Sequence, residues 1–233
     1  MQLNKEDKRN GRHTKRIETH IHTSEGSPCG KVSVQDTVKL YANAGYDVMI
    51  VTNHFNRDTV PKAGLSDREA VDYYVDIYKR ACEYGQQLGI DVWFGIETNI
   101  VGGKEDFLLY GADPQILYEN PRMYDMTQEE LFAECVQFGC LLYQAHPFRN
   151  GCFPRNPELL HGAEAYNGHP RQINNNEEAL AWILKNNLRS SSGSDFHRVQ
   201  DVGRGGILVP EYVNDIKALA DYMRKNELTL IMS

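Results

Sequence analysis

Short apolar segments alternate with helix-like segments along most of this chain, and this alternation restricts the folds open to it. Each apolar segment has the length of a strand, and apolar residues between them recur at helical spacing. Strands separated by helices form βαβ units, which give a parallel sheet or barrel. We predict a first strand from Arg16 that ends in His20-x-His22, and further strands at Tyr46–Thr52, Ile90–Ile96, Phe107–Tyr110, Cys140–Gln144, His161–Tyr166, Leu188–Ser192 and Leu228–Ile231.

Several of the intervening segments carry helix start signals. Ser33 is predicted to cap a helix that ends at Gly45, since a serine hydroxyl accepts from the first free backbone N–H groups and glycine permits the left-handed turn at the end. A Ser or Thr followed three residues later by Glu forms a capping box. The sequence predicts such boxes at Ser66/Glu69 and Thr127/Glu130.

Metal-ligating residue types gather at the predicted ends of the strands. His20 and His22 are two residues apart, so strand alternation points both imidazoles to one face. The other strand ends carry His54, Glu97, His146, Asp195 and His197. In closed βα barrels the active site lies at the C-terminal ends of the strands. Eight histidines scattered at random would rarely place five at such ends, and we therefore predict a metal centre.

The predicted ligands are imidazole nitrogens and carboxylate oxygens, with no cysteine motif among them. This set suits zinc, manganese or iron in a hydrolytic site better than a closed structural zinc site. Glu97 ends a buried strand, where a carboxylate is costly unless it is paired or metal-bound. We expect Glu97 to bridge two ions. A centre with two ions makes hydroxide at neutral pH and binds both the attacking and the leaving oxygen of a phosphoryl transfer.

Composition and charge are those of an ordinary water-soluble enzyme. Of 233 residues, 41% are hydrophobic, which is enough for the core of one domain. We predict this domain at 16–233, preceded by a polar arm at 1–15. The net charge of −7 offers no basic field to long nucleic acid. Five cysteines without a C-x-x-C pair, no signal peptide and no apolar run of about 20 residues favour a reduced, cytoplasmic chain outside the membrane.

The motifs at the strand ends resemble, in order, those of the PHP (polymerase and histidinol phosphatase) domain family. They are His20-x-His22, Thr52-Asn53-His54, Gly95-Ile96-Glu97, Ala145-His146-Pro147 and Ser194-Asp195-Phe196-His197. The resemblance implies an α/β fold in the form of a distorted (β/α)7 TIM-like barrel. It also implies two or three divalent ions (Zn, Mn or Fe) at the C-terminal face, where metal-bound hydroxide would attack a small phosphate monoester.

The resemblance further implies how the ions would be held. One ion would be bound by His20, His22, Glu97 and Asp195; Glu97 and His146 would contribute to a second, and His54 and His197 to a third. No side chain is clearly required as a general base, although Asp195 or His197 could shuttle a proton.

The chain departs from the family pattern at three places. Asn53 stands where the family usually has Asp, so we expect a changed environment for the histidine that follows it. The family often supplies a ligand five or six residues after His-x-His, where this chain has Ser27 and Pro28; Glu25 is the nearest substitute and is predicted as a ligand. Asp106 lies near the position of a further family histidine. The number of ions, and whether Glu25 or Asp106 binds one, stays open.

Phosphate recognition requires cationic donors near the metals. Arg149 and Arg198, close to His146 and His197 in the sequence, are the predicted phosphate-binding residues, with Arg204 as a weaker third, because a guanidinium binds phosphate through a planar fork. Asn167 is predicted to orient the substrate or a ligand. We expect that His13, His161 and His169 do not bind metal, and that Cys29 and Cys152 are not nucleophiles.

Three other functions are weighed against a phosphomonoesterase. An amide- or ring-hydrolysing metal barrel also begins with His-x-His, but it places a carboxylated lysine at the fourth strand end, where this chain has none. A non-catalytic module could bind metal or nucleotide without turnover, and bound metal of less than one ion per chain would favour it. An exonuclease or oligonucleotide phosphatase is disfavoured by the acidic balance. The sequence identifies neither the substrate nor the oligomeric state.

Overall fold

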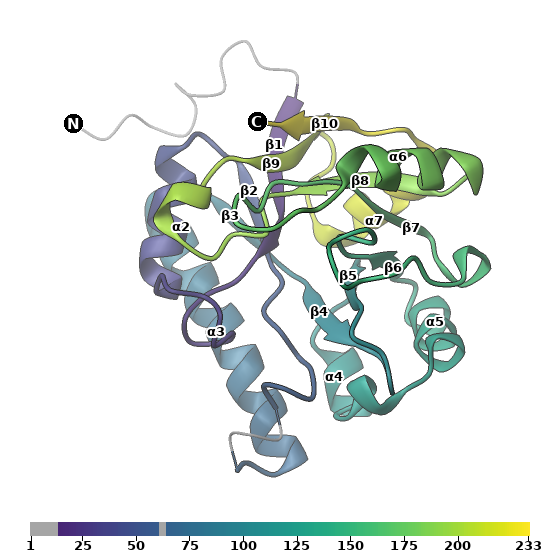
Figure 1. Cartoon of the computed structure of the whole chain (residues 1–233). Helices are drawn as coiled ribbons and strands as arrows, with labels where there is room; N and C mark the ends of the chain where they lie inside the picture. Colours follow the sequence, from purple (N-terminus) through teal and green to yellow (C-terminus); the bar gives the residue numbers. More distant parts are fainter. Residues whose placement is uncertain (1–13, 61–63) are drawn as a thin grey trace.

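The computed structural model describes residues 14–60 and 64–233, and its ten strands form two five-stranded sheets (Figure 1). The first sheet has the order β10-β9-β1-β2-β3, and the second has the order β4-β5-β6-β7-β8. The strands are β1 (Thr14–Ile21), β2 (Val48–Val51), β3 (Asp91–Phe94), β4 (Ile96–Asn99), β5 (Asp106–Tyr110), β6 (Leu141–Gln144), β7 (Gly162–Asn167), β8 (Arg189–Gly193), β9 (Gly205–Pro210) and β10 (Thr229–Met232).

The sheets are mixed rather than wholly parallel. β1, β2 and β3 run parallel, as do β6, β7 and β8, whereas β5 is antiparallel to both β4 and β6, and β9 is antiparallel to both β1 and β10. The predicted parallel pairing across a helix occurs for β1/β2, β2/β3 and β7/β8. The pair β4/β5 is antiparallel and has no helix between its strands, whereas β5/β6 and β9/β10 are antiparallel although helices lie between them in the chain.

The helices cover the outer faces of the sheets. Figure 1 shows α2 and α3 beside the first sheet and α5 and α6 beside the second. Their bounds are α2 (Val34–Asn43), α3 (Asp67–Leu88), α4 (Gln115–Glu119), α5 (Gln128–Gln137), α6 (Asn176–Lys185) and α7 (Ile216–Lys225), with short 3₁₀ turns η2 (Met123–Asp125), η3 (Pro157–Leu159) and η4 (Val199–Asp201). No helix in the described part of the chain is long and apolar enough to cross a membrane.

The predicted helix caps are present. The Ser33 hydroxyl accepts from the backbone N–H of Asp36 at the start of α2. Both predicted capping boxes form, at the starts of α3 and α5. Gly89 ends α3 in the left-handed conformation, with φ of 74°. These hydrogen bonds span only a few residues, which is why sequence spacing predicts them well.

The expected TIM-like barrel is not formed: among residues 14–60 and 64–233, the strand ladders give two sheets and no closed barrel. The predicted strand Ile90–Ile96 divides at Gly95, so that β3 pairs with β2 while β4 pairs with β5. A Cβ atom at Gly95 would lie 2.6 Å from Ile50 Cγ2. The chain thus passes closely over β2 as it crosses from one sheet to the other, and this crossing interrupts the ladder.

At the other junction, serine hydroxyls take the place of a backbone ladder between β8 and β9. Ser194 Oγ accepts from Gly205 N at 3.1 Å, and Ser192 Oγ accepts from Gly206 N at 3.3 Å. The strand backbones still approach closely, since a Cβ atom at Gly205 would lie 2.1 Å from the carbonyl carbon of Gly193. The sheets are therefore packed against each other at this edge without sharing strand hydrogen bonds.

Two isolated bridges join the sheets at the ends of their strands. Ile21 at the end of β1 bridges to Phe196, and His54 after β2 bridges to Glu97 in β4. The space between the sheets is filled by one hydrophobic cluster to which both contribute, including Ile17, Val48, Leu108, Tyr110 and Tyr143. This packing fixes the strand ends of one sheet relative to those of the other.

Three further differences from the prediction concern element boundaries. The predicted polar arm at 1–15 lies outside the described residues except for Thr14 and Lys15, which already belong to β1. The strand β9 was not predicted, because Gly205–Pro210 follows β8 without an intervening helix pattern. The last strand is shifted by one residue, to Thr229–Met232.

Candidate metal centre

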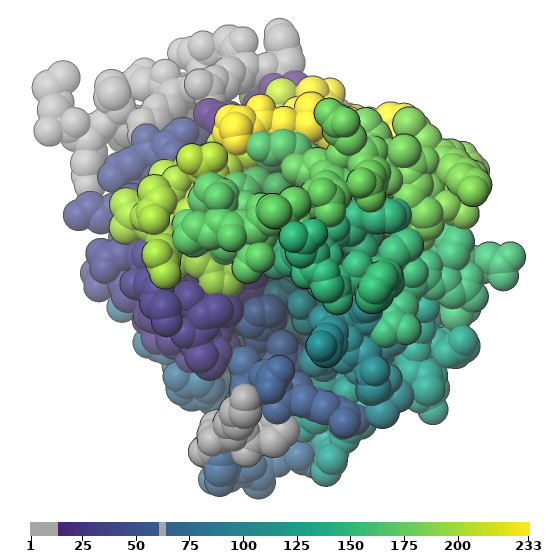
Figure 2. Space-filling model, viewed as in Figure 1, coloured from purple at the N-terminus to yellow at the C-terminus, as the bar shows by residue number. Residues whose placement is uncertain are grey.

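The predicted metal ligands other than Glu25 converge at the strand ends, where the two sheets meet. They are His20 from β1 and His22 just after it, His54 after β2, Glu97 in β4, His146 after β6, and Asp195 and His197 after β8. All of them except His54 and His197 are buried, and those two are partly exposed. Figure 2 shows a hollow on this face of the molecule, between the segments that follow β1 and β2 and those from the second sheet.

Three of the imidazoles are anchored through Nδ1. His20 Nδ1 donates to Glu164 Oε1 at 2.9 Å, and His197 Nδ1 donates to the Asp195 carbonyl at 2.7 Å. His22 Nδ1 lies 3.1 Å from Ser27 Oγ. A histidine that donates through Nδ1 keeps a lone pair on Nε2 for a metal. The Nε2 atoms of His20 and His22 lie 3.1 Å apart, so a proton or a cation is required between them.

Glu97 occupies the middle of the cluster. Its carboxylate oxygens lie 3.1 Å from His20 Nε2, 3.2 Å from His22 Nε2, 2.8 Å from His54 Nδ1 and 3.4 Å from His146 Nε2. Neither oxygen meets hydrogen-bond geometry with any partner in the described part of the chain, although Glu97 is fully buried. A buried carboxylate surrounded by imidazoles but without a directed donor is typical of a bridging metal ligand.

The charges of the cluster depend on one another. Burial alone would lower the pKa of His20, but Glu164, Glu97 and Asp195 hold this pKa well above its ordinary value. Burial would raise the pKa of Glu97, yet His54, His20 and His22 hold it well below the usual range. The carboxylates thus retain protons on nearby imidazoles, and divalent ions would replace those protons.

Asp195 connects the imidazoles to Arg149. Its Oδ1 lies 3.2 Å from His22 Nε2, and its Oδ2 accepts from Arg149 Nη2. Burial would raise the pKa of Asp195, but Arg149 and His20 hold it well below the ordinary value. Asp195 has a positive φ of 50°, as His146 has one of 30°. Such backbone strain in residues other than glycine is common where a side chain must be aimed into a site.

Glu164 is a functional residue that sequence reasoning missed. Its Oε1 accepts from His20 Nδ1, and its Oε2 accepts from the backbone N–H of His146 and from Asn167 Nδ2, all at 2.9 Å. It therefore orients two candidate ligands at once. The available signal was a lone glutamate among small residues in the predicted strand His161–Tyr166.

Glu18 is a second buried carboxylate that was not singled out. It lies two residues before His20, so it occupies the same face of β1. Its Oε1 accepts from the backbone N–H groups of Thr19, His20 and Ser194, at 3.0, 3.1 and 2.9 Å. Burial raises the pKa of Glu18 to about 7. Glu18 thus joins β1 to the segment after β8, directly beneath the ligands.

Asn53 organises the loop after β1 from beneath. Its Oδ1 accepts from Thr23 N at 2.7 Å and from Ser27 Oγ at 3.1 Å. Ser27 Oγ in turn accepts from His54 N at 2.9 Å and contacts His22. The Asn53 amide therefore holds Ser27, which orients His22. Its Nδ2 group also donates to Thr23 Oγ1, and an Asp at this position would have no such donor.

Glu25 does not reach the cluster, contrary to the prediction. Its carboxylate accepts from Val34 N at the start of α2, at 3.1 and 3.0 Å for its two oxygens. The carboxylate is held there because the first turn of a helix offers free N–H groups and a positive dipole end. Asp106, by contrast, lies beside His54 and Glu97. Burial and the charge of Glu97 raise the pKa of Asp106 to about 6.

The predicted phosphate-binding residues lie at different distances from the cluster. Arg149 is paired with Asp195 and also donates to Asn167 Oδ1 at 3.0 Å and to Asn174 Oδ1 at 2.9 Å. Asn167 is buried within this network. Arg198 is exposed, and only its backbone N–H is fixed, by Asp201 Oδ2 at 2.8 Å.

The residues predicted not to bind metal are placed as follows. His13 lies outside the described residues. The ring of His169 lies 5.0 Å from that of His197, centroid to centroid, so this residue borders the site. His161 accepts from Leu142 N at 3.1 Å, away from the cluster. Neither His161 nor His169 belongs to a group able to hold an ion among the described residues.

Comparison with known proteins gives one partial family match and several similar folds. A family model described as PHP-associated matches residues 174–228. The fold is similar to that of a two-domain protein from Bacteroides vulgatus containing a predicted PHP-like metal-dependent phosphoesterase, with a TM-score of 0.67 and 18% identity over 94% of this chain and 65% of that one. The match and the similar fold agree with the PHP resemblance of the sequence motifs. No curated protein matches its sequence.

Two further solved structures have a similar fold. PsfC from Pseudomonas syringae is similar with a TM-score of 0.67 and 16% identity, over 95% of this chain and 93% of that one. A lesion-specific endonuclease Q from Pyrococcus furiosus is similar with a TM-score of 0.60 and 11% identity, over 92% of this chain and 57% of that one. The chain thus spans somewhat under two thirds of the B. vulgatus protein and of endonuclease Q.

The residues of this cluster fit divalent ions. Four groups of three side chains each place their ligating atoms within 4.8 Å of one another. The groups are His20/His22/Glu97, His22/Asp195/His197, His54/Glu97/Asp106 and His22/Cys29/His54. Their donors are nitrogen, oxygen and one sulfur, and the two oxygens of buried Glu97 lack directed donors. The donor set and the unpartnered carboxylate both agree with metal binding.

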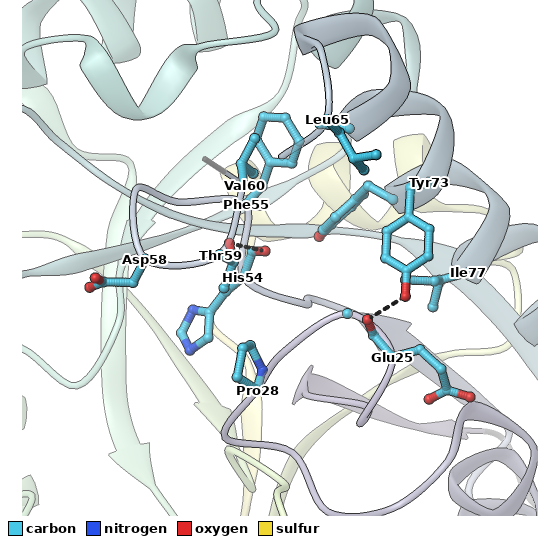
Figure 3. Close-up of a pocket in the computed structure, with 13 residues that line it drawn as sticks. Glu25, Pro28, His54, Phe55, Asp58, Thr59, Val60, Leu65, Tyr73 and Ile77 are labelled. Atoms are coloured by element: carbon cyan, nitrogen blue, oxygen red, sulfur yellow. Dashed lines mark hydrogen bonds between the residues drawn. The ribbon is translucent and has the colours of Figure 1, made fainter. Parts of the chain in front are cut away.

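A cavity of about 500 Å³ opens beside His54 (Figure 3). Its walls come from the loop after β1, the loop after β2 and the start of α3. The lining is mostly apolar and aromatic, with Phe55, Val60, Leu65, Tyr73, Tyr74 and Ile77. Figure 3 shows His54 on one side of this cavity and Tyr73 on the other, where the Tyr73 hydroxyl donates to the Glu25 carbonyl at 3.0 Å.

Proposed function

We propose that this chain hydrolyses small phosphate monoesters with two or three divalent ions, which would be Zn²⁺, Mn²⁺ or Fe²⁺. The observation that carries the proposal is the environment of Glu97, a buried carboxylate without a directed donor that four imidazoles surround. The partial match to a PHP-associated family model, and the similar fold of a protein containing a predicted PHP-like metal-dependent phosphoesterase, support the same proposal.

The ions would be held by His20, His22, His54, Glu97, His146, Asp195 and His197, with Asp106 as a further oxygen donor. When bound, divalent ions supply a nucleophilic water at neutral pH and neutralise charge on the phosphoryl oxygens. The chain's own contribution is orientation. Glu164 and Ser27 fix the rings of His20 and His22 through Nδ1, so that each Nε2 lone pair points into the site.

Arg149 would bind the phosphoryl group. Its side chain is 15% exposed while the Asp195 carboxylate beside it is buried, so the guanidinium lies between the ligands and the opening. Asn167 and Asn174 hold it through separate nitrogens. A guanidinium fixed in this way loses little freedom when phosphate binds, and its planar fork suits two phosphate oxygens. Because Arg198 is exposed, its guanidinium would contact only the solvent-facing part of a bound substrate.

His197 would accept or return the proton that the reaction moves. Its Nδ1 is engaged with the Asp195 carbonyl, so Nε2 carries the lone pair. This atom would either bind an ion or exchange a proton with water. Asp195 is the second candidate for proton transfer, through the oxygen that does not pair with Arg149.

The cavity beside His54 would receive the organic part of the ester. A monoester has one organic group at phosphorus, and a volume of about 500 Å³ accommodates a group of metabolite size. The net charge of −7 disfavours long nucleic acid as the substrate, in contrast to the DNA on which an endonuclease acts. We also propose that residues 16–233 form one domain. We further propose that the chain is located in the reducing cytoplasm, and the five free cysteines support this location.

The test combines metal analysis with two chromogenic esters. The purified chain is loaded with Mn²⁺, Zn²⁺ or Fe²⁺, its bound metal is counted, and hydrolysis of p-nitrophenyl phosphate is compared with that of bis(p-nitrophenyl) phosphate. We expect at least one ion per chain and preferential hydrolysis of the monoester. Glu97→Gln should lower turnover at least about 100-fold.

Glu134→Gln is the matched control, because Glu134 lies on α5 and contacts Asn120 far from the strand ends. It should leave turnover unchanged. The proposal is wrong if no ion and no pH supports monoester turnover, or if the wild-type chain and Glu97→Gln behave alike. Preferential hydrolysis of the diester would keep the metal centre but reject monoester specificity.

A further inference from the structure

The loop after β1 brings Cys29 to the candidate metal centre. Its Sγ atom and one nitrogen each of His22 and His54 lie within 4.8 Å of one another. Cys29 is free and exposed. The extra ligand predicted for this loop was Glu25, whose carboxylate is instead bound to the N-terminus of α2. The structure therefore offers a different donor from the same loop.

The loop holds Cys29 in this position by backbone hydrogen bonds on both sides. Gly30 N donates to the Ser27 carbonyl at 2.9 Å, which closes a tight turn around Cys29. Lys31 N donates to the His197 carbonyl at 2.8 Å, which ties the loop to the segment after β8. The thiol is thus carried by a tight turn that is tied to the segment after β8.

A second observation points to a ligand at the same place. Glu97 Oε2 is buried, lacks a directed donor in the described chain, and lies 3.2 Å from His22 Nε2 and 2.8 Å from His54 Nδ1. It is therefore aimed at the two imidazoles that Cys29 adjoins. Two nitrogens, a carboxylate oxygen and a sulfur are four donors, which is the usual coordination number of protein-bound zinc.

We propose that Cys29 is a thiolate ligand of an ion that it shares with His22 and His54. The proposal rests on the metal centre proposed above and adds its softest ligand. On binding, the thiol proton leaves to solvent and a sulfur–metal bond forms, with no change of oxidation state. Because thiolates favour Zn²⁺ over Mn²⁺, this corner of the site selects zinc.

The experiment uses the full chain with Co²⁺, Zn²⁺ and Mn²⁺, and compares Cys29→Ser with Cys82→Ser. Cys82 is a suitable control because it lies on α3, where its Sγ contacts the Val92 carbonyl at 3.6 Å. Co²⁺ bound by a thiolate absorbs in the near ultraviolet through sulfur-to-metal charge transfer. We expect this band in the wild-type chain and in Cys82→Ser, and its loss in Cys29→Ser.

Two further readouts do not depend on activity. Saturating Zn²⁺ should slow alkylation of Cys29 by iodoacetamide at least about tenfold in the wild-type chain, as measured by peptide mass spectrometry. Cys29→Ser should lower Zn²⁺ affinity about 10- to 100-fold and change Mn²⁺ affinity less than about threefold. The alkylation measurement needs no variant, so it decides even if Cys29→Ser folds poorly.

The outcomes separate this proposal from the proposed function. If the wild-type chain binds ions and hydrolyses monoesters, but Zn²⁺ leaves Cys29 alkylation unchanged and the Co²⁺ band is absent, the thiolate assignment is wrong and the function stands. If the wild-type chain binds less than one ion, both fail together. A band that persists in Cys29→Ser would assign the sulfur ligand to another cysteine and would also overturn the proposal.

Discussion

Replacement of Glu164 by glutamine tests whether the metal centre depends on the residues that orient its ligands. Glu164 is buried and accepts three hydrogen bonds at 2.9 Å, from His20 Nδ1, His146 N and Asn167 Nδ2. Glutamine has nearly the same shape but only one acceptor oxygen. Its NH₂ group must therefore face either the His20 ring or the two donors of His146 and Asn167.

Either orientation disturbs a ligand. If the amide NH₂ faces His20, it stabilises the tautomer with the proton on Nε2, which removes the lone pair that a metal needs. If the NH₂ group faces His146 N and Asn167 Nδ2, N–H groups point at one another and those two hydrogen bonds are lost. The loss of one hydrogen bond to a charged group is about 1.5–3 kcal/mol. This corresponds to a loss of about 10- to 100-fold in metal affinity, which agrees with the usual effect of removing such a partner.

The assay is competition between the protein and a chromogenic chelator for Zn²⁺ and Mn²⁺, with Glu164→Gln compared to the wild-type chain. Glu134→Gln on α5 again serves as the control and should bind as the wild type does. Unchanged affinity and unchanged ion count in a folded Glu164→Gln variant would refute the reasoning. It would mean that the ring of His20 is oriented by packing alone.

Three other predictions concern stability and the cavity. Burial lowers the pKa of His161 to about 4 in the fold, so its contribution to stability is complete above its ordinary value of 6.5 and is lost as pH falls toward 4. In urea unfolding with chelator present, the free energy of unfolding of His161→Gln should therefore fall by about 1–2 kcal/mol less than that of the wild-type chain, a value that allows for the partial exposure of His161. An equal fall in the two chains would contradict this prediction. Gly205→Ala should lower the free energy of unfolding by about 1–3 kcal/mol, because its Cβ would lie 2.1 Å from the Gly193 carbonyl carbon; thermal unfolding at the wild-type temperature would reject it. Tyr73→Ala should raise KM for an aryl phosphate about fivefold with little change in kcat, whereas Tyr212→Ala, remote from the cavity, should change neither.

The local features of the fold were predictable from the sequence. The caps of α2, α3 and α5 formed as expected, because the hydrogen bonds that define them join residues three positions apart. The pair His20 and His22 also required only strand alternation, which depends on neighbouring residues. The places of the other ligands followed from the ordered motifs, and the structure brings them together.

The departures arose where distant segments compete for the same partner. Glu25 was the nearest substitute for the family ligand that follows His-x-His, but its carboxylate is bound to the backbone N–H of Val34 at the start of α2. Arg149 was predicted to bind phosphate, and the structure pairs its guanidinium with Asp195, a partner that the sequence did not indicate. The predicted strand Ile90–Ile96 divides because the chain passes closely over β2 at Gly95. The sequence around Gly95 does not indicate this contact.

The sequence by itself determined which residue types stand at the strand ends, and hence the chemistry available to this protein. The tertiary structure decided how those ends are oriented: Glu164 comes to His20 across 144 positions, and Asp195 comes to Arg149 across 46. It also decided that Cys29, rather than Glu25, reaches His22 and His54. The physical reason is that periodicity and capping act within a few residues, whereas a metal site requires side chains from strands that only the packed sheets bring together.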